Sequence, residues 1–167
     1  MFLDESGVNT DETRHYGRAV GGERVHDATP LNTPKSTSIL SSVRMNGETV
    51  YTTYSGAVNG ERFQEYLRDY LCATLRPGDI VVMDNLRAHK VQGVQEIIAS
   101  VGATVLYLPP YSPDLNPIEQ MWSKIKAFLR SIKARTVESL LSTIPIAFKS
   151  VSVDDILGCF TCAGYGR

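Results

Sequence analysis

Cysteine is scarce in this chain, with three residues among 167. Three cysteines cannot build the disulfide framework of a small secreted domain. Cys159 and Cys162 form one Cys-x-x-Cys pair, but a structural zinc site needs two further ligands at suitable spacing. Neither Cys72 nor the three histidines lie at an obvious spacing to supply these two further zinc ligands. The pair also lacks the βαβ setting in which a redox-active Cys-x-x-Cys usually lies. The sequence therefore favours cysteines packed in the core.

Long hydrophobic runs are also missing. No stretch of about eighteen apolar residues occurs, so no membrane span is expected. The N-terminal residues do not combine a basic region with a long apolar region, which argues against a secretory signal. These absences predict a cytoplasmic protein without a membrane partner.

The chain has no excess of either charge, because its formal net charge is −1. A nucleic-acid-binding surface would need its positive charge gathered in one place. One stretch is dense in basic residues: Lys124, Lys126, Arg130, Lys133 and Arg135. Such a run is most often a solvated helix face, and both interpretations stay open on composition alone.

The hydrophobic content of 43% in 167 residues suits one domain, 1–167, with a proper core. Short apolar or β-branched runs predict strands at 1–4, 24–28, 39–45, 49–54, 79–84 and 104–108. Asn46-Gly47 separates two of these runs and predicts a hairpin, since both residues accept positive φ. Gly21-Gly22 marks a turn, and Pro30 and Pro34 bracket a loop.

Helical spacing of apolar residues predicts helices at 60–75 and 91–101, the second ended by Gly102. Another helix should begin at Pro117 with Asn116 as its cap, and bury a stripe comprising Ile118, Met121, Trp122, Ile125, Phe128, Leu129 and Ile132. A helix after Thr136 should kink or end at Pro145. A last helix follows Ser152, with a capping box to Asp155.

This order of elements predicts an α/β fold. Antiparallel hairpin strands come first, and strands then alternate with helices, which gives a mixed sheet flanked by helices.

Three acids occupy positions that suit metal chemistry. Asp4 and Asp84 each end an apolar run, and Glu119 opens an amphipathic helix. Functional groups gather at the carboxyl ends of strands, and hard divalent cations take oxygen ligands. Each acid also has an ordinary interpretation. Asp84 could form a turn, Glu119 could cap its own helix, and Asp4 could face solvent.

The helix after Pro117 carries acid and base on one face. Glu119, Lys126, Arg130 and Lys133 are spaced seven, four and three apart, away from the apolar stripe. A metal-binding acid followed by basic side chains suits a phosphodiester backbone, which such contacts position without reading its sequence. The sequence therefore predicts a DNA-binding face on this helix.

Three segments together resemble a known family: MFLDESG, LRPGDIVVMDNLRAHK and LPPYSPDLNPIEQMWSKIK. They are similar to the catalytic core of DDE transposases, especially the bacterial insertion-sequence branch of the mariner-like superfamily. The 35 positions from Asp84 to Glu119 fit that family's spacing between its second and third acids. The resemblance implies an RNase H-like fold and a site that binds two divalent cations, Mg²⁺ with Mn²⁺ as a substitute. Asp4 would bridge the ions, and Asp84 and Glu119 would each hold one.

The resemblance also implies surrounding roles and partners. Asn85 and His89 would support the acids from outside the metal shell, and Lys90 and Lys124 would join the DNA contacts. The substrates would be transposon ends and target DNA, bound by a possible homodimer at the bacterial nucleoid. Relatives carry helix-turn-helix domains ahead of this core, and none is recognised here. Three explanations stay open: one half of a frameshift-split transposase, with a helix-turn-helix polypeptide upstream as a possible partner, a truncated copy, or a misplaced start.

Two other functions remain open from the sequence. A non-catalytic fragment would bind DNA or intact transposase without cutting. An RNase H-like nuclease would cut without joining strands.

Overall fold

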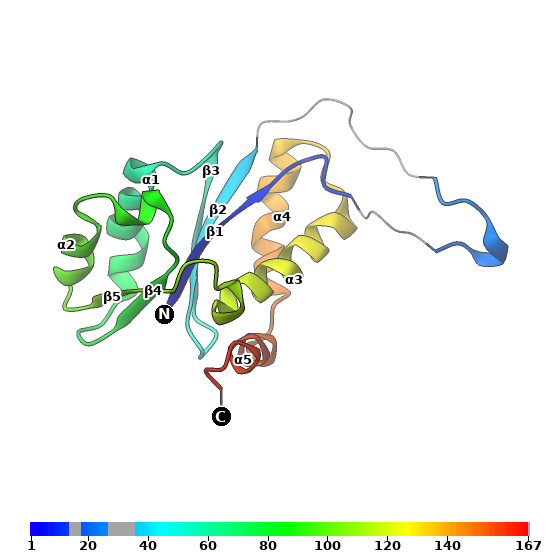
Figure 1. Ribbon diagram of the computed structural model, residues 1–167. Helices are drawn as coiled ribbons and strands as arrows, with labels where there is room; N and C mark the ends of the chain where they lie inside the picture. Colours follow the sequence, from blue (N-terminus) through cyan, green and yellow to red (C-terminus); the bar gives the residue numbers. More distant parts are fainter. Residues whose placement is uncertain (14–17, 27–35, 167) are drawn as a thin grey trace.

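The computed structural model describes residues 1–13, 18–26 and 36–166. Five strands form one mixed sheet in the order β3-β2-β1-β4-β5. Helices α1 and α2 lie on one side of this sheet, and α3, α4 and α5 lie on the other (Figure 1). The predicted α/β class and the order of hairpin followed by alternating elements are confirmed.

The first three strands form the antiparallel half of the sheet. They are β1 (Phe2–Val8), β2 (Thr37–Val43) and β3 (Thr49–Ser55). In the predicted hairpin, Gly47 has φ 89° and its N–H donates to the Arg44 carbonyl over 3.0 Å. Asn46 does not adopt the positive φ that we expected for it, and its side chain accepts the Glu48 N–H instead.

The parallel half comprises β1, β4 (Ile80–Met83) and β5 (Thr104–Tyr107). Strand β4 pairs with β5 along its whole length, but with β1 only at Phe2 and Leu3. The expectation that β1 ends at Asp4 is wrong. The Asp-Glu-Ser-Gly sequence looks like a turn, yet β2 pairs with all seven residues of β1 and keeps them extended.

The helical segments have these bounds: α1 (Gly60–Tyr66), η2 (Leu67–Leu71), η3 (Cys72–Thr74), η4 (Arg87–Lys90), α2 (Val94–Ala99), α3 (Pro117–Ile132), α4 (Val137–Lys149) and α5 (Val153–Cys162). Segments α1, η2 and η3 follow one another without a gap, so the helix predicted at 60–75 is helical from 60 to 74. Its middle part, η2, is a π-helix. The predicted capping box of α5 is confirmed, with Ser152 and Asp155 bonded reciprocally.

Two cores flank the sheet, because successive strand residues point to opposite faces. Phe2 packs with residues of α3, α4 and α5, whereas Leu3 packs with residues of α1, η2 and α2. By the same alternation, Asp4 points towards α3 and Glu5 points to the opposite face. The strand thus delivers two neighbouring acids to different sides of the sheet.

Several local predictions fail. Residues 24–26 are not a strand, and 27–28, like Pro30 and Pro34, lie outside the described residues. Helix α2 begins only at Val94, and Ile132 is half-exposed because α3 ends there. Of the two outcomes predicted for Pro145, the end of the helix is wrong, because α4 continues to Lys149; the missing N–H still removes one hydrogen bond of the helix.

The predicted core packing of the cysteine pair is also only half right. Cys159 is partly buried and packs against the α3–α5 core, but Cys162 is exposed. All three cysteines are free thiols.

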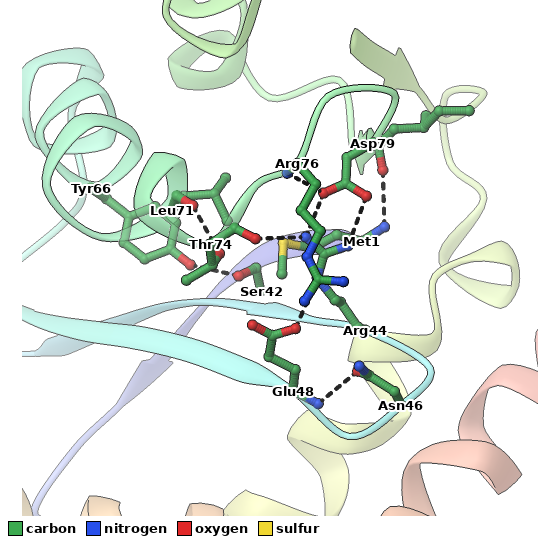
Figure 2. A network of polar contacts seen from close by, with 11 residues as sticks. Met1, Ser42, Arg44, Asn46, Glu48, Tyr66, Leu71, Thr74, Arg76 and Asp79 are labelled. Carbon is green, nitrogen blue, oxygen red and sulfur yellow. Dashed lines mark hydrogen bonds and ion pairs between the residues drawn. The ribbon is translucent and has the colours of Figure 1, made fainter. Parts of the chain in front are cut away.

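A polar network closes the end of the sheet where β4 begins (Figure 2). Arg44 donates two hydrogen bonds to the Asp79 carboxylate, at 2.9 and 2.6 Å, and a third to the Thr74 carbonyl. It also pairs with Glu48 at 3.1 Å. This network joins the β2–β3 hairpin to the start of β4.

Among the described residues, no helix combines the length and hydrophobicity needed to cross a membrane.

Candidate active site

The three predicted acids meet at the end of the sheet opposite the Arg44 network. Asp4 lies just beyond the last β1–β4 pair, Asp84 directly follows β4, and Glu119 lies in the first turn of α3. Asp4 is only 4% exposed. Asp84 and Glu119 line a pocket of about 440 Å³, together with the loop from Leu108 to Pro113.

Asp4 is in an unfavourable environment for a negative charge. Burial, followed by the charges of Glu119 and Asp84, raises its pKa to about 8, although the Glu5 backbone N–H donates to it at 2.8 Å. No ion pair among the described residues includes Asp4 or Glu119. Two carboxylates without a basic partner among these residues, beside a third that pairs only with a histidine, create a demand for a cation at this place.

Asp84 is held by a buried histidine. His89 is fully buried, its Nδ1 lies 2.6 Å from Asp84 Oδ1, and its ring stacks against Phe63 at 4.4 Å. Burial alone would raise the pKa of Asp84. Hydrogen bonds from His89 and the Leu86 N–H, with nearby positive charge, lower that pKa below its ordinary value. His89 therefore contacts an acid of the site directly, and an ionised Asp84 is available as a ligand.

Asn85 lies beside the same pocket. Its side-chain amide donates to the Leu108 carbonyl, which ties the exit of β4 to the exit of β5. This bond positions the loop that leads from β5 to the third acid. Asn85 thus supports the pocket wall by holding the Leu108 carbonyl.

The proline-rich loop forms that wall with a strained residue at its tip. Tyr111 has φ 57° and is completely exposed, between Pro110 and Ser112. Left-handed backbone is costly for a bulky residue and tends to occur at functional sites.

Asn116 does not act as the helix cap that its position suggested. It occupies the N-cap position of α3, but its side chain makes no capping bond. Instead, Nδ2 donates to Asp4 Oδ2 over 3.3 Å, and Asn116 is 3% exposed. A buried carboxylate needs donors, and this requirement takes the amide away from the helix terminus.

Sequence reasoning missed Glu5 and gave Trp122 only a place in the core. The indole N–H of Trp122 lies near Asp4 and lowers its pKa, without a hydrogen bond of good geometry. Glu5 lies on the opposite face, where burial raises its pKa and the charge of His89 lowers it. Strand alternation would have placed Glu5 near His89 if β1 had been predicted at its full length.

The predicted DNA-binding residues differ in whether they form ion pairs with acidic residues. Lys124 pairs with Asp155, and Arg130 pairs with Glu12 at 3.5 Å. Lys126 is in none of the ion pairs found in the described part of the chain. Lys133 ends α3 with φ 56°, and Lys90 lies over the Tyr107 ring at 5.5 Å. The basic face is therefore partly neutralised by acids.

The donor set suits hard divalent cations, because it consists of carboxylate and amide oxygens. Asp84 and Glu119 line one pocket and Asp4 lies near them, but the three acids are not gathered around one point. Within residues 1–13, 18–26 and 36–166, no three Asp, Glu, His or Cys side chains are arranged to hold a metal ion together. The role of the three acids as shared ligands stays a prediction.

Comparison with known proteins shows the family and the fold of this chain. The family model described as DDE superfamily endonuclease matches residues 1–141. The chain belongs to this family. The Transposable element Tcb1 transposase of Caenorhabditis briggsae is 28% identical over 85 residues, which are 51% of this chain and 31% of that protein.

Solved structures support the fold. A Mos1 transposase paired-end complex with the left transposon end has a TM-score of 0.77 and 19% identity, covering 96% of this chain and 50% of the other. A mariner Mos1 paired-end complex with Mg has a TM-score of 0.73 and 20% identity, covering 99% and 55%. These similarities establish an RNase H-like fold. This chain spans 31% of the Tcb1 transposase and 50% and 55% of these two Mos1 chains.

Proposed function

We propose that this chain is the catalytic domain of a DNA transposase. The observation that carries the proposal is the proximity of Asp4, Asp84 and Glu119 at one end of the sheet, with no ion pair to Asp4 or Glu119 among the described residues and with the pKa of Asp4 raised to about 8. A buried acid with so strongly raised a pKa, beside a pocket lined by two further acids, is typical of functional sites. The family assignment and the order of the three acids along the chain support the same conclusion.

Asp4, Asp84 and Glu119 would hold two Mg²⁺ ions, for which Mn²⁺ would substitute. Bound in pairs, such ions generate a nucleophile from water or a hydroxyl and stabilise the leaving oxygen of a phosphodiester. His89 keeps the Asp84 carboxylate oriented and ionised. Asn85 holds the proline-rich wall against which the substrate would lie. No serine or tyrosine nucleophile is required.

The substrate would be DNA: first a transposon end, and then the target. Cleavage frees a 3′-hydroxyl, which attacks the target phosphodiester in the same pocket. Lys90, Lys124, Lys126, Arg130 and Lys133 would contact phosphates. Such contacts position a duplex without reading bases. Because the helices of the described region commit apolar faces to the core, a helix-turn-helix polypeptide would select the ends, and a homodimer would pair them.

The proposed place of action is bacterial DNA, in the cytoplasm. The membrane plays no part in the proposed reaction.

The test is cleavage of labelled duplex DNA by the purified chain and by Asp84→Asn. We expect Mg²⁺-dependent nicking by the wild type and none by the variant, which keeps the shape but loses the charge that holds a cation. Equal nicking by both proteins would refute the role of Asp84. Nicks without joined products would favour a nuclease, and DNA binding without nicks would favour a non-catalytic fragment.

A further inference from the structure

We infer that Asn116 is a positioning residue of the proposed metal site: its amide N–H fixes the Asp4 carboxylate, and its amide oxygen faces the bound cation or a water on that cation. This inference rests on the proposed function and adds a residue to it. Asn116 takes no part in making or breaking bonds; it acts by orienting Asp4 and by facing the cation or its bound water.

The first argument is where the side chain goes. Asn116 is almost completely buried, it lines the pocket that Asp84 and Glu119 share, and its Nδ2 donates to Asp4 Oδ2 at 3.3 Å. The other Asp4 oxygen, Oδ1, accepts the backbone N–H of Glu5. Each carboxylate oxygen thus has one fixed donor and retains lone pairs for a further ligand.

The second argument is that the Asn116 side chain does not cap α3. Asparagine is among the most favourable N-cap residues because its side-chain oxygen normally accepts an N–H of the first turn. Here only the backbone carbonyl of Asn116 serves α3, accepting the Glu119 N–H at 3.1 Å. The helix forgoes its side-chain cap, and Asp4 receives the amide instead.

The third argument is an unused acceptor. Asn116 Oδ1 is buried and has no hydrogen-bond partner among the described residues. A buried polar atom without a partner is unfavourable and requires an explanation, such as an ion or a water that completes the site. An amide oxygen suits Mg²⁺ or its bound water. It also adds no charge to a site that already contains three carboxylates.

The alternative is that Asn116 only begins the helix, and Asn116→Ser separates the two roles. Serine is as good an N-cap as asparagine, but it is too short to replace the amide between Asp4 and the pocket. Asn116→Gly, which costs little as a cap, serves as a second variant. Thr136→Ala is the matched control, because Thr136 is an ordinary side-chain cap of α4, accepting the Ser139 N–H at 3.1 Å.

Mn²⁺ affinity, measured by electron paramagnetic resonance, and metal-free thermal stability are the two readouts. Loss of a group that orients a metal ligand typically weakens metal affinity by about 10–100-fold. We expect Asn116→Ser and Asn116→Gly to show such a loss while their midpoints of unfolding stay close to the wild type. Thr136→Ala should do the reverse, with a lowered midpoint and unchanged affinity.

Three outcomes decide the matter. A loss of affinity of more than two-fold in every Asn116 variant that folds supports the inference. Affinity within two-fold of the wild type in any of these variants overturns it and leaves the proposed function intact. If the wild type binds no Mn²⁺, the proposed function and this inference both fall, so the two failures are distinguishable.

Discussion

Acidic residues lie at both ends of strand β4, and they differ in their partners and in the direction of their pKa shifts. Asp79, before the strand, accepts two hydrogen bonds from Arg44 and one from the Arg76 N–H at 2.7 Å, and these hold its pKa well below the usual range. Beyond the strand, Asp4 lies near Asp84 and Glu119, and its pKa rises to about 8. The same residue type is thus stabilised as an anion at one end and destabilised at the other.

This difference in pKa distinguishes an acid that stabilises the fold from acids that could bind a cation. A bidentate arginine–carboxylate pair joins a hairpin to a strand and leaves no coordination capacity. A buried carboxylate such as Asp4, which lies near two other acids and has no ion-pair partner in the described part of the chain, opposes folding, and this arrangement is typical of functional sites. The Arg44–Asp79 end therefore maintains the structure, and we assign the Asp4 end to chemistry.

The largest expected effect is on cleavage. Asp4→Asn should lower Mg²⁺-dependent nicking by roughly 10³-fold or more, because it removes a charge that stabilises the cations. Asp79→Asn should leave the rate within about two-fold, since Asp79 only holds Arg44. Nicking rates of the two purified proteins provide the measurement. Similar losses in both variants would contradict the assignment of separate roles.

The next effect is on stability, with opposite signs at the two ends. At pH 8 without metal, Asp4→Asn should raise the free energy of unfolding by about 1–3 kcal/mol, because the buried charge is gone. Asp79→Asn should lower it by about 1–2 kcal/mol through loss of the bidentate pair. Urea denaturation followed by circular dichroism measures both changes.

Proton linkage fixes the pH dependence of these changes. The folded pKa of Asp4 is raised, so folded protein keeps a proton that unfolded protein has released, and metal-free stability falls as pH rises from about 4 to 8. The advantage of Asp4→Asn should therefore grow over that interval. The pKa of Asp79 is lowered, so its contribution is present above about pH 4 and is lost in acid. A constant difference between Asp4→Asn and wild type across this range would argue against a neutral Asp4.

Much of this architecture follows from the sequence, because local patterns dominate there. Strand β4 ends where its apolar run meets Asp84, and Pro117 begins α3 as expected. Long-range contacts determine what local patterns could not show. Pairing with β2 extends β1 past Asp4, although its residues look like a turn. Asn116 was assigned to the helix terminus because Asp4, which is 112 positions away in the chain, is invisible to local reasoning.

The same limit applies to the charged residues around the site. Spacing placed Lys126 and Arg130 on one helical face, but it could not show that Glu12 would pair with Arg130. It also could not show that His89 would be buried against Asp84. These contacts depend on how separate elements pack. The candidate acids were predictable from local sequence, but the groups that orient them were not.

A smaller effect is expected on DNA binding, where two lysines of α3 differ in whether they are paired with an acid. Lys126→Gln should reduce the slope of log affinity for DNA against log salt by about one, for every sequence alike. Lys124→Gln should reduce it less, because Lys124 already pairs with Asp155. Fluorescence anisotropy at several salt concentrations measures the slopes. An unchanged slope for Lys126→Gln would mean that this face is merely solvated.

The smallest expected effect is on stability, through two residues with positive φ at the two ends of the sheet. Near Asp79 the chain uses Gly78 with φ 90°, whereas the proline-rich loop places Tyr111 at φ 57°. Tyr111→Gly should stabilise the protein by about 0.5–1 kcal/mol, and Gly78→Ala should destabilise it by about 1 kcal/mol. Thermal denaturation tests both, and Tyr111→Ala, which keeps the strain, is the control. A loss of stability in Tyr111→Gly would show that the tyrosine side chain stabilises the loop.

The central claim is that the acids at the Asp4 end hold divalent cations, and Mn²⁺ titration tests it most directly. Free Mn²⁺ would be counted by electron paramagnetic resonance in solutions of wild type, Asp4→Asn and Asp79→Asn. We predict binding by the wild type and by Asp79→Asn, with a loss of at least ten-fold in affinity, about 1.4 kcal/mol, for Asp4→Asn. Equal affinity in all three proteins would contradict the claim.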